Sequence, residues 1–203
     1  MKGSIIIIAF FALGIAVGLL FSTCNLQFSI FNLHFSTFIL YALMFCVGIS
    51  IGSDTKTLKN FKDVNPRLMI LPVMTVVGTL AGTAAASALL PHRHLFDCLA
   101  IGSGFGYYSL SSIFITEYKG AELGTIALLA NIMREIITLL CAPLLVRYFG
   151  KLAPISMGGA TTMDTTLPII TRTSGQDYVI VSIFHGFCVD FSVPFLVTFF
   201  CSI

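Results

Sequence analysis

The chain contains long runs of apolar residues with few charges between them, and this feature most limits what it can fold into. Only 10% of its 203 residues are charged, whereas soluble domains carry about 25%. A helix of ~20 apolar residues crosses the hydrocarbon core of a bilayer. Five runs are predicted to form such spans: residues 4–22, 36–52, 67–90, 121–147 and 178–201. The sequence therefore predicts an all-α integral membrane protein with a single transmembrane domain over residues 1–203.

Two further segments are apolar at their ends and rich in Gly, Ser and Thr in the middle. Residues 99–116 read LAIGSGFGYYSLSSIFIT, and residues 154–170 read PISMGGATTMDTTLPII. Irregular backbone at membrane depth persists only where it is packed in protein or lines a cavity, because lipid cannot satisfy its polar groups. We therefore expect two re-entrant or broken helical hairpins. Close helix packing at the glycines is one alternative, and two full crossings, which would give seven spans, is another.

The distribution of Lys and Arg predicts the orientation, because basic residues accumulate on the cytoplasmic side. With five spans and two re-entrant hairpins, eight basic residues lie on the side of the N-terminus, and only Arg93 and Lys119 lie on the other side. Seven full spans would give seven against three, so the re-entrant arrangement is favoured. The N-terminus is predicted inside and the C-terminus outside, in the bacterial inner membrane. The eight inside residues are Lys2, Lys56, Lys59, Lys62, Arg67, Arg147, Lys151 and Arg172.

Arg134, Glu135 and Asp164 are ionisable residues within the predicted membrane region. The run ANIMREIITLL places Asn131, Glu135 and Thr138 on one helical face, with Arg134 about 100° from Glu135. Asp164 stands in the second polar segment. Each charge at the bilayer centre costs roughly 2.5–3.5 kcal/mol on insertion. Two interpretations remain open: a structural Arg–carboxylate pair, or a polar cavity whose surplus negative charge suits a cationic substrate, a metal ion or protons.

Other functional classes have no support in the sequence. The six cysteines are scattered and show no metal-ligand spacing. No nucleophile–base set or metal-ligand cluster is recognisable. We therefore predict that the protein is not an enzyme, needs no cofactor or metal and binds no nucleic acid.

Several motifs together resemble those of a known family. They are SGFGYYSLSSIFITE (residues 103–117), Arg134–Glu135, GATTMDTTLP (159–168), RTSGQD (172–177) and HGF (185–187). They closely resemble the C-terminal part of the LysO family of bacterial L-lysine exporters, and the resemblance covers nearly the whole chain. It implies export of lysine and lysine analogues across the inner membrane, with an essential pair of intramembrane acids. By position in the motifs, these acids are Glu135 and Asp164.

The chain departs from the family pattern in two respects. Longer family members carry further spans before the matched region, so we expect either a small membrane subunit that supplies them or a homo-oligomer. Asp190 lies outside the family pattern. It follows His185 by five residues, about 140° around a helix, which argues against a direct pair.

We therefore expect a secondary transporter that exports L-lysine by alternating access in exchange for protons. The alternatives are a membrane subunit that is inactive without a partner, and a cation or proton channel. Glu135 and Asp164 are expected to bind substrate ammonium groups or the proton. The residues expected to shape the cavity are Asn131, Arg134, Ser109, Thr161 and Thr165. The secondary candidates are Ser103, Tyr108, Ser111, His185 and Asp190.

Overall fold

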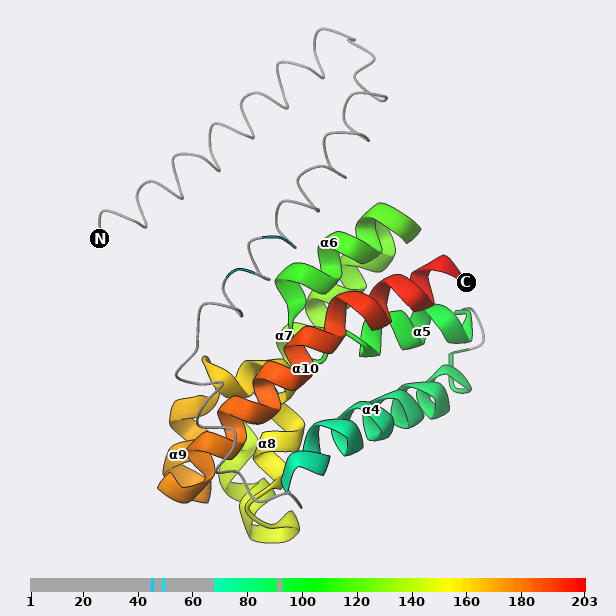
Figure 1. The fold of residues 1–203 in the computed structure, drawn as a ribbon. Helices are drawn as coiled ribbons and strands as arrows, with labels where there is room; N and C mark the ends of the chain where they lie inside the picture. Colours follow the sequence, from blue (N-terminus) through cyan, green and yellow to red (C-terminus); the bar gives the residue numbers. More distant parts are fainter. Residues whose placement is uncertain (1–44, 46–48, 50–67, 91–92) are drawn as a thin grey trace, which may run out of the picture. The chain divides into compact units, whose positions relative to one another are not determined.

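The computed structural model describes residues 45, 49, 68–90 and 93–203, and every regular element in this part of the chain is helical. Figure 1 shows their arrangement. In chain order the elements are η2 (Leu68–Ile70), α4 (Leu71–Ser87), α5 (Leu95–Gly102), α6 (Tyr108–Lys119), α7 (Ala121–Phe149), α8 (Ala153–Gly158), η3 (Gly159–Met163), α9 (Leu167–Ser174), η4 (Gln176–Tyr178) and α10 (Val179–Ser202).

Three of the predicted membrane spans are confirmed. Three stretches of the described residues form helices long and apolar enough to cross a bilayer: Leu68–Ser87, Ala121–Phe149 and Gln176–Ser202. They agree with the predicted spans within a few residues. The first two predicted spans, residues 4–22 and 36–52, lie outside the described residues apart from positions 45 and 49, which are helical. The chain is thus an all-α membrane protein.

The first polar segment is a hairpin of two short helices, α5 and α6. Its two ends lie close together: the Lys119 ammonium at the end of α6 is 3.7 Å from the Asp97 carboxylate at the start of α5. Arg93, just before α5, also pairs with Glu122 in the first turn of α7. A segment that crossed the membrane would separate its ends by the bilayer thickness. The segment therefore turns back at residues 103–107, as the re-entrant interpretation requires.

The second polar segment turns back in the same way. It consists of α8, the 3-10 helix η3 and α9. The Ser174 hydroxyl at the end of α9 donates a hydrogen bond of 2.8 Å to the carbonyl of Lys151, which precedes α8. This hairpin begins where α7 ends, whereas the first hairpin returns to the start of α7. The two hairpins therefore enter from opposite ends of α7 (Figure 1).

The tips of the two hairpins contact each other directly. The Ala160 N–H donates a hydrogen bond of 2.9 Å to the carbonyl oxygen of Phe105. The first tip turns at Phe105 and Gly106, with φ of 45° and 94°. Gly159 has φ of 63°, and a Cβ there would lie 2.2 Å from the Phe105 oxygen. Glycine at this position therefore permits both the turn and the close approach of the tips.

Helix α10 is the most buried of the three long helices. It packs against α4, α5, α6, α9 and η3. Half of its most apolar window is buried, compared with 11% for α4 and 17% for α7. Side chains on the packed faces of α10 therefore lie inside the protein, whereas α4 and α7 present much of their apolar surface outward. Polar residues on α10 must consequently be satisfied by protein or by an internal cavity.

Candidate functional site

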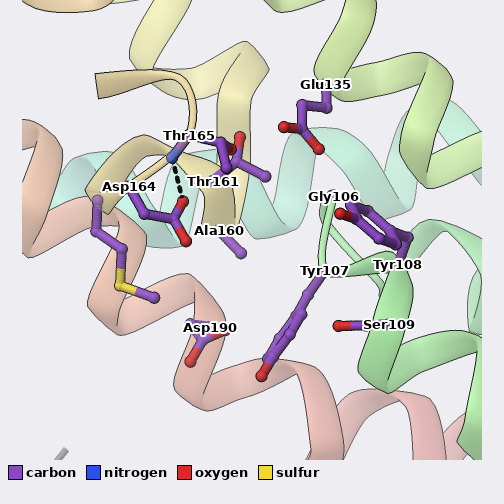
Figure 2. Close-up of a pocket in the computed structure, with 11 residues that line it drawn as sticks. Gly106, Tyr107, Tyr108, Ser109, Glu135, Ala160, Thr161, Asp164, Thr165 and Asp190 are labelled. Atoms are coloured by element: carbon purple, nitrogen blue, oxygen red, sulfur yellow. Dashed lines mark hydrogen bonds between the residues drawn. The ribbon is translucent and has the colours of Figure 1, made fainter. Parts of the chain in front are cut away.

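A cavity of about 160 Å³ lies where the two hairpin tips meet α7 and α10 (Figure 2). A cavity needs only roughly 10–15 Å³ to hold one water molecule, so the space admits several waters or a small ligand. The first hairpin contributes four residues at its turn, and the second contributes η3 and the loop that follows. The lining residues are Gly106, Tyr107, Tyr108, Ser109, Glu135, Ala160, Thr161, Met163, Asp164, Thr165 and Asp190.

Three of the lining residues are acidic, and none is Lys, Arg or His. Glu135 comes from α7, Asp164 from the loop after η3, and Asp190 from α10. Within the described residues, no three acidic, histidine or cysteine side chains lie close enough to hold a metal ion. The three carboxylates therefore surround a space instead of converging on a point. A space lined by three acids and no basic side chain suits a positively charged ligand.

The hydroxyl-rich second tip uses most of its polar groups to satisfy its own backbone. The Thr161 hydroxyl donates to the Gly158 carbonyl at 2.9 Å, and the Thr166 hydroxyl donates to the Thr161 carbonyl at 3.0 Å. Asp164 ends η3 and accepts a hydrogen bond of 2.6 Å from the Thr165 N–H. Asp164 and Thr165 are exposed, whereas Thr161 and Thr166 are buried. The fold thus presents Asp164 and Thr165 to the cavity.

Asn131 supports the first hairpin from outside the cavity. Its amide nitrogen donates to the Ala127 and Ile101 carbonyls at 2.9 and 3.2 Å. Its side-chain oxygen accepts the Gly106 N–H at 2.8 Å. This buried amide therefore satisfies backbone groups that the helix break between α5 and α6 leaves open. One turn later on the same face, Glu135 lines the cavity.

Arg134 supports the second hairpin and pairs with neither predicted acid. Its guanidinium donates to the Met157 carbonyl at 2.8 Å and to the Ser156 carbonyl at 3.1 Å. A third, longer hydrogen bond of 3.3 Å reaches the Thr79 hydroxyl. The ion pairs of the described residues join Arg93 with Glu122 and Lys119 with Asp97. Among the described residues, Arg134 therefore forms no ion pair with Glu135 or Asp164.

His185 joins three elements through hydroxyl groups. Its Nε2 lies 2.9 Å from the Thr75 hydroxyl on α4, and its Nδ1 lies 3.2 Å from the Thr162 hydroxyl on η3. The Thr75 hydroxyl also contacts that of Ser156 at 2.8 Å. His185 is fully buried, and its ring nitrogens lie against these two hydroxyls and not against Asp190. It acts here as an interior polar link between α10, α4 and the second hairpin.

The structure brings together seven of the predicted candidates and leaves five outside the cavity. Those lining it are Glu135, Asp164, Ser109, Thr161, Thr165, Tyr108 and Asp190. Ser103 and Ser111 instead donate to the Leu99 and Tyr107 carbonyls. The other candidates outside the cavity are Asn131, Arg134 and His185. Sequence reasoning missed Tyr107 and Met163, although Tyr107 stands beside Tyr108 within the GFGYY motif.

The fold and the cavity define a multi-pass α-helical membrane protein with an acidic binding cavity between two opposed broken hairpins. Residues 8–201 match the family described as Lysine exporter LysO, so the chain belongs to this family. The predicted family is confirmed.

Two relatives extend the comparison. The Lysine exporter LysO of Escherichia coli (strain K12) is 40% identical over 161 residues, which are 79% of this chain and 53% of that protein. A Putative lysine exporter of Haemophilus influenzae is 34% identical over 164 residues, or 81% of this chain and 83% of the relative. The chain thus spans about half the length of the E. coli relative. No solved structure matches the chain.

Proposed function

We propose that this chain exports L-lysine across the bacterial inner membrane by alternating access, in exchange for protons. The observation that carries the proposal is a cavity lined by Glu135, Asp164 and Asp190 and by no basic side chain. Lysine at neutral pH carries two ammonium groups and one carboxylate. A site for such a molecule needs several separated acids, and the cavity provides them. The names of the two relatives support the choice of lysine.

Glu135 and Asp164 are proposed to bind the ammonium groups. They lie on different elements of the cavity wall, α7 and the second hairpin (Figure 2). Neither is paired with an arginine or lysine within the described residues, so their negative charge is available to a ligand. The hydroxyls of Ser109 and Thr165 also line the cavity and offer further hydrogen bonds.

The substrate carboxylate is proposed to bind at the start of α6. The N-cap residue Tyr107 forms no side-chain capping bond. In the first turn the Tyr108 N–H donates to the Gly106 carbonyl, whereas the N–H groups of Ser109 and Leu110 have no partner among the described residues. Tyr108 and Ser109 in this turn line the cavity. The partial positive charge of a helix N-terminus attracts anions. Opposed broken helices that meet at a central site are typical of secondary transporters, in which access alternates between the two sides.

The test is to neutralise each acid without changing its size. Asp164→Asn and Glu135→Gln should each reduce lysine export by about a hundredfold, because losing a charged partner costs roughly 3 kcal/mol. Export is measured in proteoliposomes, and membrane abundance is measured alongside. Abundance should stay normal, since neither acid is needed to neutralise Arg134. The control is Asp177→Asn, which changes an exposed acid outside the cavity. Normal transport in both variants would contradict the assignment.

A second candidate function is a membrane subunit that transports only together with further spans. The observation that favours it is that the matched region makes up 53% of the E. coli relative. In that case the chain alone should fail to protect lysine-sensitive cells from a toxic lysine analogue, and a coexpressed small membrane protein should restore protection. Full activity of the purified chain in liposomes would exclude this candidate. Transport that saturates with lysine would exclude a channel.

A further inference from the structure

Asp190 is the most enclosed acid of the cavity. It lies on a packed face of α10, and the residue is only 6% exposed. Figure 2 shows the Tyr107 side chain extending toward α10 and Asp190, with Asp164 on the neighbouring loop. Among the described residues no group donates a hydrogen bond to its carboxylate, and no basic residue pairs with it. An ionised carboxylate in such a place is costly unless a cation or a proton joins it.

The other two acids of the cavity have different surroundings. Asp164 is exposed, and its carboxylate oxygen accepts a hydrogen bond from the Thr165 N–H. Glu135 is half-buried on α7. Among the described residues, the titratable groups that line the cavity with Asp190 are Tyr107 and Tyr108 from the first hairpin, Asp164 from the second and Glu135 from α7. Elements α4, α5, α8 and α9 contribute no residue to the lining. Arg134 is directed to the carbonyls of α8, and His185 is bonded to hydroxyls.

We propose, building on the function proposed above, that Asp190 carries the proton that is exchanged for the substrate. When the cavity is empty, the enclosed Asp190 carboxyl is protonated. When an ammonium group enters, Asp190 releases its proton to the water of the cavity, and the cation takes the place of the proton beside the carboxylate. Proton and substrate thus occupy the site alternately, which is the condition for exchange. Glu135 and Asp164 remain the main substrate ligands.

The first experiment measures proton release when lysine binds to the purified full chain in a weakly buffered solution with a pH indicator. The wild type should release protons on binding. Asp190→Asn imitates the protonated acid, so it should bind lysine and exchange lysine for lysine, but release no proton and drive no net export by a pH gradient. Asp177→Asn serves as the control. Continued proton release by Asp190→Asn would overturn the proposal. So would complete loss of lysine binding by the folded variant, because Asp190 would then be a primary ligand.

The second experiment needs no substrate. Infrared spectra of the lysine-free protein at neutral pH should contain a protonated carboxylic acid band that disappears in Asp190→Asn and persists in Asp164→Asn. A band that survives Asp190→Asn, or is absent from the wild type, would overturn the proposal. If the wild type fails to bind lysine, the proposed function is wrong, whereas the infrared band still decides whether Asp190 holds a proton.

Discussion

The two hairpins have the same overall form but are held in different ways. At the ends of the first hairpin, one ion pair joins Asp97 with Lys119 and another joins Arg93 with Glu122. Its tip is held by a neutral amide, Asn131. The second hairpin is bound by the Arg134 guanidinium and by a network of threonine hydroxyls with His185.

The residues that support the hairpins and the acid that lines the cavity lie within about one turn of α7. Asn131 supports the first hairpin, Arg134 supports the second, and Glu135 faces the cavity between them. Because Arg134 satisfies carbonyls instead of acids, the negative charge of the cavity is left for a ligand. The Arg134 guanidinium therefore supports the fold, while the three acids of the cavity have no basic partner among the described residues.

The largest expected effect comes from disrupting the contact between the two hairpin tips. Gly159→Ala would place a methyl group 2.2 Å from the Phe105 carbonyl oxygen at a residue with φ of 63°. Overpacking and the unfavourable backbone together should destabilise the protein by about 3 kcal/mol. Membrane abundance and thermal unfolding in detergent measure the loss. Gly78→Ala is the matched control, because no atom of the described residues lies within 4 Å of a Cβ built there. Wild-type stability of Gly159→Ala would show that the tips need not touch.

A smaller effect should distinguish the two supports. Arg134→Leu leaves the Ser156 and Met157 carbonyls without donors, and Asn131→Leu leaves the Gly106 N–H without an acceptor. Each substitution should cost about 1–3 kcal/mol in total, because unsatisfied backbone groups are costly, whereas Arg134→Leu also removes a charge from the membrane region.

Two native cysteines report on the hairpins separately. Cys98 is buried on α5 of the first hairpin, and Cys188 on α10 packs beside the Ile155–Ile170 cluster of the second. Asn131→Leu should speed the reaction of Cys98 with a membrane-permeant thiol reagent, and Arg134→Leu should speed that of Cys188. Equal acceleration of both cysteines in both variants would mean that the hairpins loosen as one unit.

The smallest effect on stability is expected for Lys119→Cys and Lys151→Cys, which alter exposed residues near the ends of the first and second hairpins. An ion pair formed by a surface lysine contributes only about 0–1 kcal/mol to the free energy of unfolding, so the abundance of both variants should be unchanged. In a background without native cysteines, an impermeant reagent should label position 119 in intact cells and position 151 only after the cells are opened. Labelling of both from one side would contradict hairpins that enter from opposite faces.

Apolar length and Gly/Ser/Thr content were sufficient to predict three described spans and two broken segments, because the bilayer imposes helix length and forbids unsatisfied backbone in lipid. Helical spacing also placed Asn131 and Glu135 on one face of α7. These features depend on local periodicity and on the solvent, both of which can be read from a linear sequence.

The sequence did not determine which polar side chains face the cavity and which satisfy the backbone. Arg134 and Glu135 are neighbours in the chain, yet one binds carbonyls of α8 and the other lines the cavity. Asp190 joins Asp164 only because α10 packs against η3, although 25 residues separate them in the sequence. A hydrogen bond depends on the position and direction of its partner, and a partner on another helix is set by tertiary packing. The tertiary structure alone therefore decided that three acids share one cavity and that the arginine lies outside it.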